Sequence, residues 1–155
     1  MAITQAIANA FKKQLLEGDQ NFSSSSGDVF KLALYTSSAT LNSATTAYTA
    51  SNEVANSGQY TAGGGALTGQ NTSIASGVAI VDFNDLSFTG VTLTARGALI
   101  YNTSSAVTNA AVAVLDFEQI KQLHQELSQY SFQHLLQQRL YYESLVKKDF
   151  KWHLL

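Results

Sequence analysis

Asp82 and Asp85 lie three positions apart around an expected turn, and they are the closest approach to a metal-binding pair in the body of the sequence. A calcium loop needs more oxygen ligands at set spacing, so we interpret them as solvated turn carboxylates. His124 and His134 are ten positions apart on a possible helix, which does not suit a zinc pair. The sequence therefore predicts no metal site and no cofactor.

Candidate nucleophiles also lack the partners that catalysis requires. The serine run at 23–26 contains no GxSxG turn, and no histidine precedes His124 to act as a base. The Gly-Gly-Gly run at 63–65 lacks the Lys-Ser/Thr that completes a phosphate loop, so it predicts a flexible turn. The chain has no cysteine. These features favour a protein that is not an enzyme.

Aromatic side chains offer a binding chemistry instead. Tyrosine combines a rigid apolar face with a hydroxyl, so such residues can line a sugar-binding surface or anchor a core or a subunit interface. The sequence leaves these alternatives open for four tyrosines: Tyr35, Tyr48, Tyr60 and Tyr101. Arg96 has two possible roles, a salt bridge between subunits or an ordinary pairing within the domain, and we favour the second.

Composition limits the partners. Only 13% of residues are charged, below the roughly 25% typical of soluble domains, which suits a protein packed against copies of itself or other subunits. A net charge of −2 gives no basic patch for nucleic acid. No segment approaches the roughly 20 apolar residues of a membrane span, and the N-terminus lacks the apolar core of a secretory signal. We therefore expect neither nucleic acid nor membrane as a partner, and assembly in the cytoplasm.

The elements that must position these residues follow from periodicity. Apolar spacings of three and four predict a helix over 3–17, and a long low-charge connection follows over 37–65. Short β-type runs indicate strands, expected at 29–36, around Tyr48 and Tyr60, at 72–83 broken by Gly77, and at 86–88, 91–95, 98–101 and 110–117. The predicted fold class is α+β: an N-terminal helix, an antiparallel β-sandwich and a helical or irregular C-terminal tail.

We favour packing of the helix's apolar stripe on its own domain, with docking onto a neighbouring subunit as the alternative. The helix and the connection are the segments best placed to reach such a neighbour. Their apolar and aromatic side chains supply the interface candidates, which are Ile3, Ile7, Phe11, Tyr48 and Tyr60.

Composition changes abruptly after Phe117. Residues 118–155 hold seven of the twelve glutamines and all three histidines, but none of the ten glycines or fourteen threonines. The spacing of Ile120, Leu123, Leu127 and Tyr130 is that of an amphipathic helix. Reverse translation of 118–147 in a shifted frame instead reads TDKTASSGTFTVFIP and then AILRIA, which matches the composition of the body. We therefore divide the chain into a β-domain at 1–117 and an atypical, out-of-frame tail at 118–155.

The body resembles a group of small tailed-bacteriophage virion proteins. The resemblance rests on FKKQLLEG at 11–18, FKLALYTSSATL at 30–41, TTAYTASNEV at 45–54, GQYTAGGGALT at 58–68 and FTGVTLTARGALIYN at 88–102. Members of the group end in a DFG-x-DKT…AIIRIA pattern, which the printed chain lacks and the shifted frame restores.

The resemblance implies a structural subunit of a virion, assembled in the host cytoplasm. It would bind neighbouring virion proteins, as a head decoration or cement protein or as a tail-associated protein, and we expect a homo-oligomer. The alternative is a receptor- or glycan-binding module of a phage fibre.

Overall fold

The computed structural model describes residues 2–123, with side chains as far as Phe117. One five-stranded sheet has the order β1-β7-β6-β2-β3, and a separate two-stranded sheet pairs β4 with β5. All named strand pairs are antiparallel. The bounds are β1 Ala6–Ile7, α1 Asn9–Glu17, β2 Phe30–Tyr35, β3 Gly65–Leu67, β4 Asn71–Ala75, β5 Val78–Asp82, β6 Leu93–Asn102 and β7 Ala110–Leu123.

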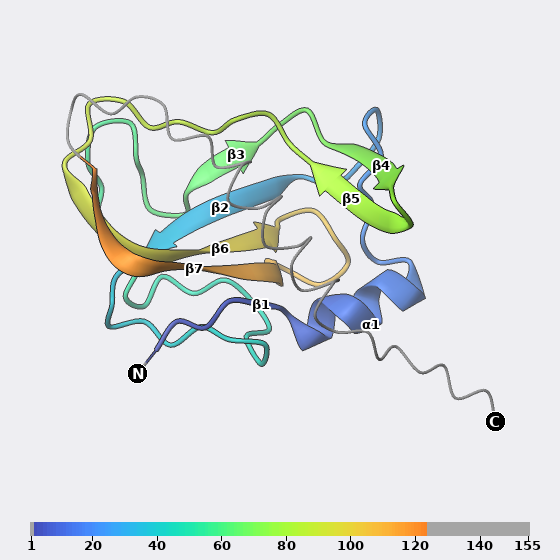
Figure 1. Ribbon diagram of the computed structural model, residues 1–155, viewed down its shortest axis with the longest axis horizontal. Helices are drawn as coiled ribbons and strands as arrows, with labels where there is room; N and C mark the ends of the chain where they lie inside the picture. The colour runs from blue at the N-terminus through green and yellow to red at the C-terminus, as the bar shows by residue number, and fades with distance from the viewer. Residues whose placement is uncertain (1, 124–155) are drawn as a thin grey trace.

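The centre of the large sheet is buried on both faces. Strand β2 is an almost continuous apolar run, and its residues Leu32 to Tyr35 are at most 1% exposed. Such a run suits a strand that is covered on both sides. Figure 1 shows α1 beneath the sheet and the β4–β5 hairpin above β2. The α+β class with a sandwich-like arrangement of antiparallel sheets is thereby confirmed.

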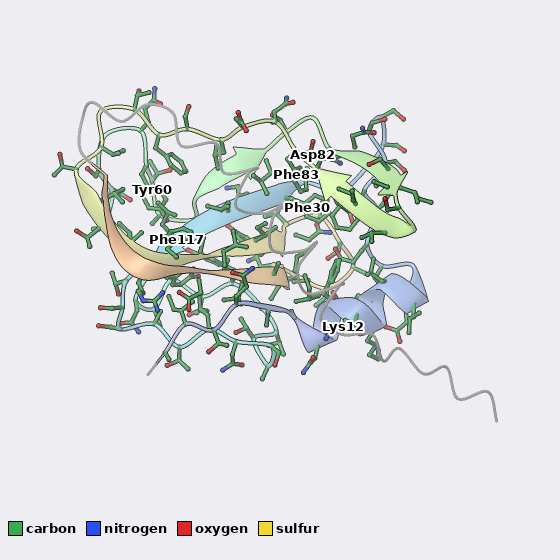
Figure 2. All side chains as sticks on the ribbon, in the orientation of Figure 1. Lys12, Phe30, Tyr60, Asp82, Phe83 and Phe117 are labelled. Atoms are coloured by element: carbon green, nitrogen blue, oxygen red, sulfur yellow. The ribbon has the colours of Figure 1, made fainter. Side chains whose placement is uncertain are left out.

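Aromatic side chains fill the space between the hairpin and the sheet. The Phe22 ring stacks on Phe30 at a centroid distance of 4.4 Å, and Phe83 meets Phe30 edge-on at 5.6 Å. Figure 2 shows Phe30 and Phe83 close together between β2 and β5. Phe11 of α1 contacts Phe22 at 6.0 Å, so one aromatic cluster joins helix, loop, sheet and hairpin.

The helix is shorter than the sequence predicted. It begins at Asn9, whereas the preceding residues are extended: the Thr4 N–H donates to the Leu41 carbonyl, and Ala6–Ile7 pairs with β7. The helix ends at Gly18, where a φ of +78° allows the N–H groups of the C-cap to reach the carbonyls of Gln14 and Leu15. The predicted helix over 3–17 was therefore wrong for its first six residues.

Most of the predicted strands are present, with three corrections. The strands predicted around Tyr48 and Tyr60 are only isolated bridges, between Ala47 and Ala110 and between Ser57 and Tyr60. The run at 29–36 forms β2, and 72–83 forms the β4–β5 hairpin with its turn at Ser76 and Gly77. The predicted strands at 91–95 and 98–101 are parts of one strand, β6, which begins at Leu93, and 86–88 is not a strand. Gly97 does not interrupt β6. The position requires glycine because a Cβ there would collide with the Leu115 carbonyl of β7.

Strand β7 crosses the predicted boundary at Phe117. Its pairing with β6 shifts between Gly97, opposite Asp116, and Ala95, opposite Lys121. Residues 117–120 of β7 therefore form a bulge, because the single residue Arg96 is all that faces them in β6. Ile120 and Leu123, which the sequence placed at the start of a helix, lie in β7 instead. The remainder of the predicted tail, from 124 onward, lies outside the described residues.

Candidate functional site

Two of the four tyrosines singled out by the sequence bind one carboxylate, that of Glu53. The Tyr48 hydroxyl donates to Glu53 Oε2 at 2.6 Å, and the Tyr60 hydroxyl donates to Glu53 Oε1 at 2.8 Å. The Gly63 N–H donates to the same Oε1 at 2.7 Å. We call this group, together with Tyr35 and Tyr101, the Tyr–Glu cluster.

The hydroxyls also bind the backbone of the surrounding elements. The Tyr60 hydroxyl accepts the N–H of Leu34 in β2 at 2.8 Å. The hydroxyls of Tyr35 and Tyr101 donate to the carbonyls of Thr49 and Gly63, each at 2.6 Å. The cluster therefore fastens the connection between β2 and β3 to the central strands.

The chemistry available to the cluster is hydrogen-bond donation. Burial raises the pKa of all four tyrosine hydroxyls above the usual value, and the Glu53 carboxylate adds to the increase. The hydroxyls are thus protonated at neutral pH and hold the carboxylate in place.

The connection over 37–65 is packed against its own domain. The Tyr48 N–H donates to the Asn109 carbonyl at 2.9 Å, and the Val54 N–H donates to the Leu34 carbonyl at 2.9 Å. Leu41 and Ala39 are each 2% exposed. The long segment therefore forms a layer of the core rather than a free loop.

This packing buries three of the five predicted interface residues and leaves two partly exposed. Ile3, Phe11 and Tyr60 are buried within the chain, at 4%, 8% and 0% exposed, so they offer little surface to a partner. Ile7 and Tyr48 are partly buried, and the Tyr48 ring stacks on Tyr101 at 4.7 Å. Of the five, only Ile7 and Tyr48 keep appreciable exposed surface.

Arg96 pairs within the domain, as the sequence favoured. Its guanidinium forms an ion pair with Asp116 across β6 and β7, next to the bulge. The Asp82 carboxylate accepts the N–H of Phe83. Within the described residues no group of three acidic or histidine side chains could hold a metal ion.

A second polar group was not anticipated from the sequence. Asn102 is fully buried at the end of β6, and its amide donates to Gln20 at 2.8 Å and to Asp28 at 2.7 Å. Gln20 in turn donates to Gln14 of α1. This network joins the helix, the loop before β2 and the end of β6, and its role is structural because every group named has a partner.

The exposed apolar residues lie outside both polar groups. They are Leu15 and Leu16 on α1, Val29 before β2, Ile74 on β4 and Val107 in the β6–β7 loop. Leu16 is 81% exposed and Ile74 is 78% exposed. Every residue of β4 is exposed, and none is charged. The hairpin and the helix thus offer the surface best suited to a partner.

No protein-family model, curated protein or solved structure matches this chain. No helix within residues 2–123 is long and apolar enough to cross a membrane.

Proposed function

We propose that the protein is a non-enzymatic structural subunit of a tailed-phage virion that binds neighbouring virion proteins. It acts as a head decoration or cement protein, or as a tail-associated protein. The observation that carries the proposal is the uncharged strand β4, in which every residue is exposed and Ile74 is 78% exposed. Such a strand exposes a monomeric protein to aggregation, whereas a subunit in an assembly can bury it.

The rigidity of the domain supports the same role. The Tyr–Glu cluster and the Asn102 network hold the long connection and the helix in fixed positions. A subunit whose surface is ordered before assembly loses less conformational entropy on binding. Repetition of modest contacts over a lattice then gives a stable particle.

The test is detection of the protein on intact particles. Antibodies raised against the folded protein should label purified virions, and mass spectrometry should find the chain at a fixed ratio to the major capsid or tail protein. Protein found only in the soluble lysate, and absent from washed particles, would overturn the proposal.

The alternative of a glycan-binding module has less support. The hydroxyls of the four tyrosines in the Tyr–Glu cluster have partners within the chain, and Tyr48 alone among these four is more than slightly exposed. A glycan array distinguishes the two functions: reproducible sugar binding that is lost in Tyr48→Ala would favour the alternative.

A further inference from the structure

The outer edge of β4 has no partner within the described chain. The turn at Ser76 and Gly77 has positive φ at both residues, 51° and 80°, as in a two-residue type I′ hairpin. Ala75 and Val78 therefore form the hydrogen-bonded pair next to the turn. Because such pairs alternate along an antiparallel ladder, the N–H and C=O groups of Thr72 and Ile74 point away from β5. No hydrogen bond joins them to any other described residue.

The edge also lacks the features that protect edge strands. Natural proteins block such edges with charged side chains, proline or bulges. Strand β4 contains no charge and no proline, and its register with β5 runs without a shift from Asn71 to Ala75. Ile74, one of the two outward residues, leaves 78% of its surface exposed.

We propose that β4 pairs antiparallel with β4 of a second copy of this chain, about a two-fold axis at Ser73. In this register Thr72 lies opposite Ile74 of the copy, and by symmetry Ile74 lies opposite Thr72 of the copy. The N–H and C=O groups of these residues form four hydrogen bonds, which is every outward group of both strands. The two hairpins become one four-stranded sheet shared between two subunits.

The register explains why the occupant is a second copy. If the register moves by two residues in one direction, Thr72 pairs with Thr72 of the copy, and Ile74 lies beyond one end of the copy's β4. If it moves by two residues in the other direction, Ile74 pairs with Ile74 of the copy, and Thr72 lies beyond the other end of that strand. Only the register centred on Ser73 satisfies both, and it sets the β-branched side chains of Thr72 and Ile74 side by side across the strands. The strand carries no charge, so two copies meet without repulsion. This contact rests on the proposed function, since it supplies the homo-oligomer that an assembled subunit needs.

Cysteine cross-linking tests the register, because the chain has no cysteine of its own. Ser73→Cys should form a disulfide-linked dimer under mild oxidation, since directly opposed residues of a non-hydrogen-bonded pair lie about 4.5 Å apart at Cα. The matched control is Ala79→Cys, exposed on the neighbouring strand and distant from the two-fold axis. Equal cross-linking of both variants would overturn the proposal.

Charge reversal tests the symmetry. Ser73→Lys and Ser73→Glu should each weaken the dimer about tenfold or more in sedimentation equilibrium, because like charges meet at the axis. Mixing the two variants should restore a dimer that contains one of each. The contact would be excluded if the full-length chain of unaltered sequence sedimented as a monomer. It would also be excluded if the two variants dimerised as strongly as the unaltered chain.

The outcomes separate this contact from the proposed function. Ser73→Lys that is monomeric yet still found on particles leaves the pairing in place and shows that particle binding uses another surface. A β4-paired dimer that is absent from particles leaves the pairing in place and refutes the virion role. Particles carrying a protein whose Ser73→Cys variant does not cross-link refute the pairing alone.

Discussion

Glu53 is the residue on which the domain's polar chemistry depends. It is the only charged residue between Lys31 and Asp82, and it receives hydrogen bonds from two tyrosines and a backbone N–H. Its two side-chain oxygens thereby join Tyr48, Tyr60 and the Gly63 N–H. It therefore fixes the connection where uniform apolar packing would leave several alternatives.

Tyr60→Phe should lower the free energy of unfolding by about 1 to 3 kcal/mol, because Leu34 N–H and Glu53 each lose a buried partner. Urea denaturation monitored by circular dichroism measures the change. Tyr101→Phe is the matched control, since it removes one hydrogen bond, to the Gly63 carbonyl, and should cost less. Equal losses in the two variants would contradict the central place given to Tyr60.

Alkaline pH should weaken the fold through the same residues. The pKa values of Tyr35 and Tyr60 are raised in the folded protein, first by burial. Above the unfolded value of about 10 the unfolded chain releases these protons first, so it binds fewer protons than the folded chain. Their contribution is complete below pH about 10 and falls above it, by about 1.4 kcal/mol per pH unit for each tyrosine.

Denaturant midpoints measured from pH 8 to pH 12 test this dependence. Tyr35→Phe should show a shallower decline than the unaltered chain, because one titrating group has been removed. A decline of unchanged slope would mean that other groups cause the alkaline instability.

At the scale of elements, the turn before β3 requires glycine. Gly64 has a φ of +72°, and a Cβ there would collide with the Leu32 carbonyl of β2. Gly77 in the hairpin turn has a φ of +80° but open space around it. The two positions share a left-handed backbone and differ in how closely another strand approaches.

Gly64→Ala should therefore destabilise the domain more than Gly77→Ala. The hairpin variant loses about 1 to 2 kcal/mol for the left-handed conformation alone, while the β3 variant must also displace backbone. Thermal and urea unfolding of both variants provide the comparison. Similar losses would indicate that β3 moves away from β2 at little cost.

Periodicity predicted some elements well and others poorly, for a physical reason. Strand β2 and the β4–β5 hairpin follow from local runs and a local turn. Ile3 and Ile7 are four residues apart, a spacing that places them on one face of either a helix or a strand. Pairing of Ile7 with β7 and of Ile3 with Leu41 decides for the extended conformation. Gly97 resembled a break but serves close packing within β6.

The candidate site was partly predictable in the same way. The four tyrosines were identified from their type, but Glu53, the partner of Tyr48 and Tyr60, was missed because no periodicity marks it. Its isolation in an uncharged segment is the signal that would have found it. The network around Asn102 joins Gln20, Asp28 and a distant strand, so only the folded topology reveals it.

At the scale of the whole molecule, the out-of-frame tail remains a prediction. Sequencing the gene across codons 115–120 and weighing the particle-derived protein should reveal the shifted frame, with a mass that differs from the printed chain. A particle-derived mass equal to that of the printed sequence would refute it.

The frame also has a consequence for stability. A protein carrying the in-frame segment after Phe117 should unfold at higher denaturant concentration than the printed chain, because its two β-type runs can complete the sheet where β7 now bulges. Comparison of the two proteins by urea denaturation and by aggregation on heating tests this. If the chain with the printed sequence were as stable as the protein with the in-frame segment, the sheet would need no further strands.

The sheet order places the first strand beside the last of the strands within residues 2–123, with Ala6 opposite Val114. During synthesis β1 has no partner until residues 113 and 114 have left the ribosome, and the apolar strand β2 waits for β6. Such distant pairings make folding slow, and they leave unpaired apolar strands exposed to other chains meanwhile. Yield in the cell should therefore depend on chaperones and on expression rate more than on the final stability of the domain.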